Sequence, residues 1–357
     1  MKPIRVAVAD DSSFIRLALA RLLGQEPNIE VVGLASSGEE LLEHLAAWQP
    51  EAIVLDLAMP GMGGLGTLDA LRARPPVPVL ILSTHSSHGA PQTIEALHRG
   101  AVDFIDKQQY SLVDFEALRA VLVEKLRQMT AVHGGESRAL PYPGGLAALG
   151  AAPASPGAID LLVVGASAGG PPAIEQILAD LGELVAVPIA IVQHMPAAFT
   201  RSFAERLNTY LPLRVQEAVH HEPLRPGFVY IAPGGQHLRI ESDRDGLRAA
   251  LSLTPEGAAH RPAVDVLFAS AGVATRGRLA AVLLTGMGSD GAASMAALAQ
   301  SGVHTIAQDR ASSVVFGMPR AAIEAGGARE VLSLERIGPR LLELLSASGP
   351  KPWPAAG

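Results

Sequence analysis

The 357-residue chain has no cysteine, few aromatic residues and no block of positive charge. The absence of cysteine excludes disulfides, thiolate metal sites and a cysteine nucleophile. Aromatic residues make up 4% of the chain and hydrophobic residues 48%, so the cores must consist mainly of Leu, Val, Ile and Ala. The formal net charge is −7, and no Lys/Arg cluster is present to neutralise phosphates. We therefore expect no nucleic-acid partner.

Long apolar runs are also missing from the sequence. No run approaches the roughly 20 residues needed to span a bilayer. The apolar stretch from Met1 to Ala9 is too short for a signal peptide, and it ends at Asp10-Asp11 rather than at small residues. These absences predict a cytoplasmic protein, and the length favours about two domains.

The first section of the chain alternates apolar strand patterns with helical patterns. Strands are expected at 4–9, 30–34, 52–56, 77–82 and 102–105, with helices such as 13–24, 38–47 and 114–129. This alternation predicts an α/β domain with a five-stranded, doubly wound parallel sheet of the flavodoxin-like type. In such a sheet, functional groups gather at the carboxyl ends of the strands.

The same alternation restarts after a segment rich in proline, glycine and alanine. Strands are expected at 161–165, 187–193, 228–232, 279–284 and 303–307, with an antiparallel excursion near 237–253. The second section therefore predicts a Rossmann-like α/β domain with a mainly parallel sheet. The expected organisation is a first domain at 1–127, a flexible linker at 128–158, a second domain at 159–347 and a tail at 348–357.

Three carboxylates follow strands of the first section: Asp10 and Asp11 after the first strand and Asp56 after the third. In a doubly wound sheet these strand ends meet at one crevice, where crowded carboxylates repel unless a cation joins them. Mg²⁺ favours such an all-oxygen site. Asp56 can then attack a phosphoryl donor, and Ser83 and Lys107 can bind phosphoryl oxygens. Alternatively, the first two acids only cap the following helix.

The pattern formed by Asp10-Asp11, Leu55-Asp56, Met59-Pro60, Ser83-Thr84 and Asp106-Lys107 closely resembles the response-regulator receiver family over residues 1–125. The resemblance implies that a histidine kinase supplies a phosphoryl group to Asp56. It also implies Mg²⁺ bound at Asp10, Asp11 and Asp56, and a switch built from Ser83, Phe104 and Lys107. Two positions depart from the family pattern. Gly63 replaces a frequent Asp, and Gln108 replaces the proline that usually follows the lysine.

The second section opens with a serine framed by glycines. The strand pattern at 161–165 leads into Gly165-Ala166-Ser167-Ala168-Gly169, which matches G-x-S-x-G, and a helical pattern follows. A tight strand-to-helix turn of this kind exposes a nucleophilic hydroxyl. The alternative is a dinucleotide-binding turn, but such a site usually has an acid about 20 residues further on. This chain has Gln193-His194 there.

His194 and Asp290 each follow a later strand pattern, so we expect them at the same sheet edge as Ser167. Ser167 needs a general base, which His194 can supply. Asp290 would hold the imidazole tautomer and stabilise its charged form. The turns at Ala168 and Met287 can aim backbone N–H groups at a developing oxyanion. Taken singly, the histidine could be structural and Asp290 a helix N-cap; their conjunction favours catalysis.

Further segments complete a second resemblance: Gln193-His194-Met195-Pro196, 199–204, 229–235, His237, Arg261-Pro262-Ala263-Val264-Asp265 and 284–291. With them, residues 159–347 closely resemble the catalytic domain of the chemotaxis protein-glutamate methylesterases (CheB type), which are also glutamine deamidases. The resemblance implies a Ser167–His194–Asp290 triad with Met287 near the oxyanion, and no cofactor for ester hydrolysis. It implies methyl-accepting chemotaxis receptors as partners, and membrane association only through their arrays. Family members often carry Thr at the position of Ala168.

Two other interpretations remain open. The cluster His220-His221-Glu222 could be a metal site, but adjacent side chains seldom converge on one ion, and a solvated loop is favoured. The chain could also be a phosphorylation-gated binding module whose triad is inactive. The complete set of serine, histidine and aspartate argues against that reading.

Overall fold

The structure, a computed structural model, describes residues 2–83, 89–107, 115–130 and 159–347. The chain divides into two compact units, Met1–Gly135 and Glu136–Gly357. Most of the expected linker and all of the expected tail, together with Thr84 and Gln108, lie outside the described residues. Within the described ranges, no helix is both long enough and apolar enough to cross a membrane.

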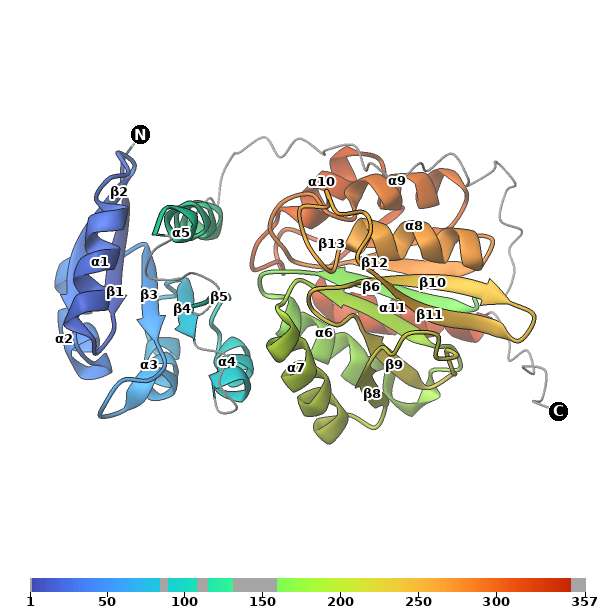
Figure 1. The fold of residues 1–357 in the computed structure, drawn as a ribbon, viewed down its shortest axis with the longest axis horizontal. Coiled ribbons are helices and arrows are strands. Elements are labelled where there is room, and N and C mark those ends of the chain that lie inside the picture. Colours follow the sequence, from blue (N-terminus) through green and yellow to red (C-terminus); the bar gives the residue numbers. More distant parts are fainter. Residues whose placement is uncertain (1, 84–88, 108–114, 131–158, 348–357) are drawn as a thin grey trace. The chain divides into compact units, whose positions relative to one another are not determined.

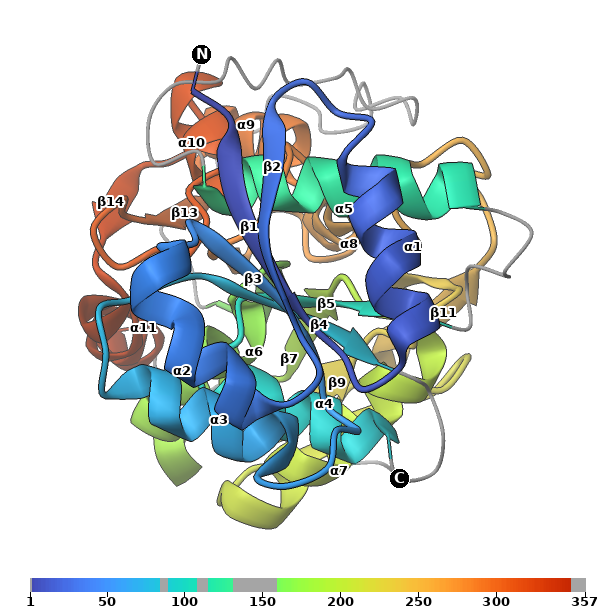
Figure 2. The same ribbon diagram turned by 90° about the vertical axis from the view of Figure 1, so that its left-hand side faces the viewer.

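The first unit is the expected five-stranded parallel sheet with helices on both faces. Its elements are β1 (Ile4–Ala9), α1 (Ser13–Leu23), β2 (Ile29–Ala35), α2 (Gly38–Trp48), β3 (Ala52–Asp56), α3 (Gly63–Arg72), β4 (Val79–Ser83), α4 (Gly89–His98), β5 (Asp103–Asp106) and α5 (Phe115–Thr130). The strand order is β2-β1-β3-β4-β5. Figure 2 shows α1 and α5 on one face and α2, α3 and α4 on the other. Because both faces are covered, the inner strands β3 and β4 are buried throughout.

The second unit is built around a seven-stranded parallel sheet. Its elements are β6 (Leu161–Ala166), α6 (Gly170–Leu181), a short 3₁₀ helix (Gly182–Leu184), β7 (Ile189–Gln193), α7 (Ala197–Tyr210), β8 (Arg214–Glu217), β9 (Phe228–Ile231), β10 (His237–Asp243), β11 (Gly246–Ser252), α8 (Val264–Ala274), β12 (Leu279–Leu283), α9 (Ala292–Gln300), β13 (His304–Gln308), α10 (Met318–Glu324), β14 (Glu330–Leu332) and α11 (Leu334–Ala347). The strand order is β14-β13-β12-β6-β7-β9-β8. In Figure 1, α8, α9 and α10 lie along one face of this sheet and α6, α7 and α11 along the other. The sequence does not predict β8 and β14, the short strands at the two edges.

The expected antiparallel excursion is the separate β10–β11 hairpin, whose apolar side chains join the same core as α8 and the sheet. Helix α8 is therefore enclosed on nearly all sides, and most of its residues are buried. One polar link ties the hairpin to this helix, because the Ile240 N–H donates to Ser270 Oγ over 3.0 Å. This packing fixes the amino-terminal end of α8, which contributes to the site described below.

Candidate functional sites

Ser167 occupies the tight turn between β6 and α6. Its N–H donates to the Thr285 carbonyl over 3.1 Å, and its carbonyl accepts from the Gly170 N–H over 2.8 Å. The Gln193 side-chain amide also donates to this carbonyl over 2.8 Å. Gly169, which lies in the turn between Ser167 and Gly170, has φ +73°, a left-handed conformation in which a residue with a side chain would be strained. The serine backbone is thus held from three sides in the strand-to-helix turn that the sequence predicts, with Ser167 half-buried and residues 168–170 buried.

The loop after β12 presses directly against this turn. A Cβ atom added to Gly286 would lie 2.8 Å from the Ser167 Cβ, so only glycine fits there. Gly286 is itself fixed, because its N–H donates to the Val315 carbonyl and its carbonyl accepts from the Met318 N–H. The neighbouring Met287, predicted near the oxyanion site, therefore belongs to a loop that is tied to its surroundings on both sides.

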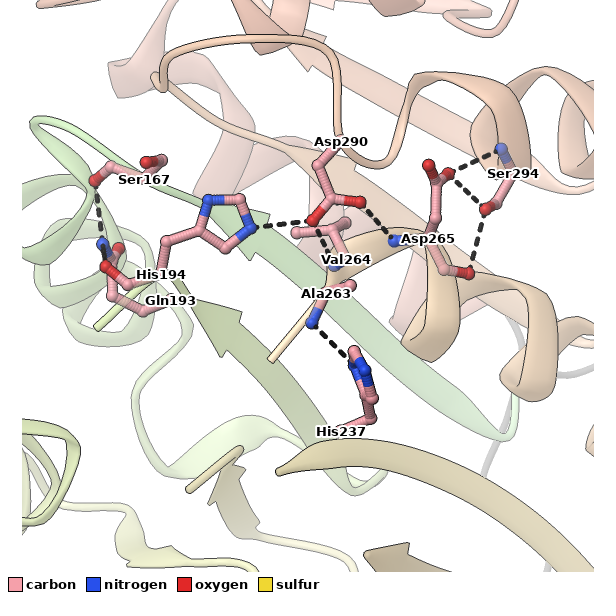
Figure 3. Close-up of polar contacts among 9 residues, drawn as sticks. All are labelled: Ser167, Gln193, His194, His237, Ala263, Val264, Asp265, Asp290 and Ser294. Atoms are coloured by element: carbon pink, nitrogen blue, oxygen red, sulfur yellow. Dashed lines mark hydrogen bonds and ion pairs between the residues drawn. The ribbon is translucent and has the colours of Figure 1, made fainter. Parts of the chain in front are cut away.

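The three predicted catalytic residues come from three neighbouring strands. In the sheet, β6 lies between β12 and β7, so Ser167 follows the middle strand. The β6–β7 pairing ends with Ala166 opposite Gln193, and His194 then donates its N–H to the Ala166 carbonyl over 3.1 Å. Figure 3 shows the His194 ring between Ser167 and Asp290. The structure therefore brings all three residues to one edge of the sheet, as the sequence predicts.

Asp290 receives three hydrogen bonds. One of its carboxylate oxygens lies 2.7 Å from His194 Nε2 and also accepts from the Val264 N–H over 2.7 Å. Its other oxygen accepts from the Asp265 N–H over 3.0 Å. Burial by itself would raise the pKa of Asp290, but the bonds from the histidine and the backbone amides lower it to about 2. The interpretation of Asp290 as a helix N-cap is wrong, because the N-cap of α9 is Gly291.

His194 has its Nε2 on the aspartate, so its other nitrogen is left for a reacting group. Its side chain is only 7% exposed, and its Nδ1 is buried without a hydrogen-bond partner. Because the carboxylate accepts a proton from Nε2, we assign the neutral ring a lone pair at Nδ1. No hydrogen bond yet joins the ring to Ser167 in this part of the structure. His260 stacks on the ring, with centroids 4.0 Å apart.

Gln193 and Thr285 are not among the predicted site residues, but both support this arrangement. Gln193 clamps the serine carbonyl, as described above. Thr285 donates its hydroxyl to the Ala168 carbonyl over 2.9 Å and accepts the Val315 N–H over 2.9 Å. Ala168 is buried beside it. Gln193 is the last residue of β7 and Thr285 lies two residues after β12, so both lie at strand ends, which is the signal that pointed to the predicted residues.

His237 stabilises the segment that precedes α8. It is fully buried; its Nδ1 accepts the Ala263 N–H over 3.2 Å, and its Nε2 donates to the Pro255 carbonyl over 3.2 Å. Burial lowers the pKa of His237, so the ring remains neutral and keeps its acceptor nitrogen. Ala263 is the N-cap of α8, whose first amides bind Asp290.

The first unit gathers its predicted acids at the carboxyl ends of its strands. Carboxylate oxygens of Asp10, Asp11 and Asp56 all lie within 4.8 Å of one another. Lys107 Nζ lies 2.9 Å from Asp10 and 3.1 Å from Asp56. Burial raises the pKa of Asp56, and the charge of Asp10 adds to the rise while Lys107 opposes it. The oxygen donors and their unbalanced negative charge fit a small divalent cation such as Mg²⁺.

The predicted switch residues Ser83 and Phe104 lie on β4 and β5, the two strands that follow β3 in the sheet. Ser83 is buried at the end of β4 and hydrogen-bonds the Thr93 hydroxyl. Phe104 is buried in β5. The interpretation of the acidic pair as helix caps is wrong, because Ser12 is the N-cap of α1 and accepts the Ile15 N–H.

The cluster His220-His221-Glu222 forms a turn with both histidines exposed, in agreement with the favoured prediction of a solvated loop. His220 Nδ1 accepts the Leu251 N–H over 3.0 Å, and Glu222 accepts from Gln216 over 2.7 Å. Among the described residues, the carboxylates of the first unit are the group with the spacing of a metal site.

Comparisons with known proteins agree with both predicted resemblances. The family model for the CheB methylesterase matches residues 162–341, and that for the response regulator receiver domain matches residues 6–119. The chain is 42% identical to a protein-glutamate methylesterase/protein-glutamine glutaminase of Nocardioides sp., over 99% of both chains. It is 40% identical to one of Geobacillus kaustophilus, covering 97% of this chain and 99% of that one. The crystal structure of the Thermotoga maritima CheB methylesterase catalytic domain is similar with a TM-score of 0.51 and 39% identity, covering 52% of this chain and 99% of that one.

Proposed function

The chain belongs to the CheB methylesterase family, and on that basis we propose that it hydrolyses γ-glutamyl methyl esters on methyl-accepting chemotaxis receptors. The same site would deamidate receptor glutamines. Full-length similarity to proteins with both activities in their names supports this substrate class. Ester and amide pass through the same kind of tetrahedral intermediate, so one set of oxyanion donors serves both reactions.

The proposed reaction begins with the Ser167 hydroxyl. Its oxygen attacks the ester carbonyl carbon while its proton moves to His194 Nδ1. Asp290 stabilises the resulting imidazolium through Nε2. The C–O bond to the methoxy group then breaks, and this leaving group takes the proton from Nδ1 and departs as methanol. Water, activated by the same nitrogen, hydrolyses the acyl-enzyme and restores the serine.

Backbone N–H groups of Ala168 and Met287 would donate to the oxyanion in both tetrahedral intermediates. Each belongs to a turn that neighbouring residues hold in place, so the donors need little reorganisation when charge develops. A single observation carries the proposal: Asp290 holds Nε2 of His194 over 2.7 Å and leaves a buried, unpartnered Nδ1. A buried imidazole nitrogen without a partner is costly unless a reacting group uses it.

The receiver unit would control this reaction through phosphorylation. A histidine kinase would donate a phosphoryl group to Asp56, and Asp10, Asp11 and Asp56 would hold Mg²⁺. The cation would neutralise charge on the transferring phosphoryl group. Lys107 would contact a phosphoryl oxygen, and the Ser83 hydroxyl and the Phe104 ring would change position with the phosphorylated state.

Methanol release from carboxyl-methylated receptor tests the proposal. We expect release by the native protein and loss of release in Ser167→Ala, with Ser301→Ala, at the far end of α9, as a matched control. Release that persists in Ser167→Ala would place the nucleophile elsewhere. No release from any of the three, with and without a phosphodonor, would overturn the proposed substrate.

A further inference from the structure

Helices α8 and α9 both begin beside the catalytic aspartate, and neither is capped by its own N-cap residue. The N-cap of α8 is Ala263 and that of α9 is Gly291, and neither supplies a side-chain hydrogen bond. The first N–H groups of a helix have no partner within it. When they are buried, as here, they need an acceptor from elsewhere.

The first turn of each helix finds its hydrogen-bond acceptor in a carboxylate that belongs to the other helix or to the segment leading into it. Asp290 lies just before Gly291, the N-cap of α9, yet its carboxylate accepts the first amides of α8, Val264 and Asp265. In return, the Asp265 carboxylate accepts the Ser294 N–H in the first turn of α9 over 2.9 Å and also bonds the Ser294 hydroxyl. The two helices thus exchange carboxylates, and Figure 3 shows this pair of contacts side by side.

The exchange is closed to solvent. Asp265 is 7% exposed and Ser294 is fully buried. If the Asp265 carboxylate is removed, the buried Ser294 N–H loses its acceptor, while the Ser294 hydroxyl keeps its bond to the Asp265 backbone carbonyl over 2.9 Å. The first turn of α9 would then have to shift, and the Asp290 segment that leads into it would shift as well.

From this geometry we infer that Asp265 is a positioning residue for ester hydrolysis. Its carboxylate holds the first turn of α9 against α8, and this fixes the Asp290 carboxylate on His194 Nε2. Asp265 acts only through Asp290, so the inference rests on the proposed function. A merely structural acid would lower the stability of the fold but leave the turnover of folded protein unchanged.

The first experiment compares kcat and KM for methanol release by the full-length chain. Asp265→Ala is expected to lower kcat by about 10- to 100-fold with KM unchanged, because small displacements of a catalytic group are costly. Asp265→Asn keeps an acceptor oxygen for Ser294 and is expected to lose less. Ser294→Ala keeps the amide contact and is expected to lose least. Should the alanine variant fail to fold, this ranking of the two milder variants still decides the question.

A double-mutant cycle then shows whether the effect passes through Asp290. In an Asp290→Asn background, Asp265→Ala should lower kcat no further. Multiplicative losses, a change confined to KM, or an unchanged kcat in folded Asp265→Ala would each overturn the inference while leaving the triad intact. An unchanged kcat in Asp290→Asn alone would instead overturn the proposed triad, and with it the role of Asp265.

Discussion

Both units place aspartates at the carboxyl ends of a doubly wound parallel sheet, but the two sites surround these acids differently. In the first unit, Asp56 faces another carboxylate, and a lysine compensates its charge only in part. Burial and Asp10 raise the pKa of Asp56. In the second unit, Asp290 faces an imidazole and the amides of a helix start, which hold its pKa well below the usual value.

The comparison teaches that the partner of a carboxylate, and not its place in the fold, decides its chemistry. A carboxylate with uncompensated charge binds a cation and attacks an electrophile. A carboxylate saturated with donors stays ionised and serves as a fixed counter-charge for the imidazolium. The predictions below test this difference, beginning with the largest expected effect.

Replacing Asp290, the proposed counter-charge of the imidazolium, should have the largest effect on the rate of hydrolysis. Asp290→Asn is expected to lower kcat for methanol release by about 10³- to 10⁴-fold, because an amide neither stabilises the imidazolium nor fixes the required tautomer. The measurement is initial-rate methanol release at saturating methylated receptor. Asp245→Asn on the exposed β10–β11 turn is the matched control. A loss of less than about tenfold would mean that the negative charge of Asp290 does not stabilise the imidazolium of His194 to a useful extent.

Replacing Asp56, the residue that we propose accepts the phosphoryl group, should leave ester hydrolysis at the other unit intact. Asp56→Asn is expected to abolish phosphorylation by a small-molecule phosphodonor and any stimulation of hydrolysis by it, while basal methanol release persists. Phosphate-affinity electrophoresis and the methanol assay report the two effects. Asp69→Asn, on α3 of the same unit, should behave like the native protein. Phosphorylation that survives in Asp56→Asn would contradict the assignment.

The uncompensated charge of the first unit predicts a pH-dependent response to Mg²⁺. The pKa of Asp56 is higher in the folded state than in the unfolded chain. The free energy of unfolding of this unit therefore falls as the pH rises from the unfolded-state pKa through the folded-state pKa. Protons compete with the cation for the same oxygens, so the gain in Tm on adding Mg²⁺ should be larger near pH 7.5 than near pH 5. At tenfold excess over Kd the gain corresponds to about 1.4 kcal/mol.

Calorimetry of the full-length chain with and without Mg²⁺ measures this response. Asp11→Asn removes the exposed member of the cluster and is expected to reduce the gain. An identical gain at both pH values, or in Asp11→Asn, would show that the cation binds elsewhere.

The last prediction concerns stability alone and involves Asp265, the acid beside Asp290. Burial, followed by the negative charge of Asp290, raises the pKa of Asp265 to about 6. The unfolded chain ionises first, so this group lowers stability as pH rises from about 4 to about 6. Asp265→Asn removes that loss, and its free energy of unfolding relative to the native protein should increase with pH, on the order of 3 kcal/mol by pH 7. Calorimetry from pH 4 to 7 checks this, and a difference that does not change with pH would contradict it.

The sequence predicts the inner strands well because strands covered on both faces must be apolar throughout, as in 52–56 and 161–165. It misses β8 and β14, since short edge strands such as Arg214–Glu217 carry no such run. Helix boundaries differ from the expected ones by a residue or two. The end of α1 is an example: the sequence predicts a helix over 13–24, and the structure ends it at Leu23 with Gly24 as its C-cap.

The sequence also predicts which residues meet at each site, because residues that follow neighbouring strands converge. It does not predict which nitrogen of His194 meets Asp290, since this depends on how the ring is turned in the folded chain. Nor does it predict the Asp265–Ser294 contact. These residues are 29 positions apart and meet only because α8 and α9 pack with their first turns together.

The register between β6 and β7 determines whether Ser167 and His194 can meet. Ser167 and His194 are the next residues after the paired Ala166 and Gln193. A slip of one residue between these strands would move the two side chains by about 3.3 Å and turn one of them to the opposite face. No intermediate register exists in which the pair works at reduced efficiency. Damage to this part of the sheet should therefore reduce the number of active molecules in a preparation and leave the turnover of each remaining one unchanged.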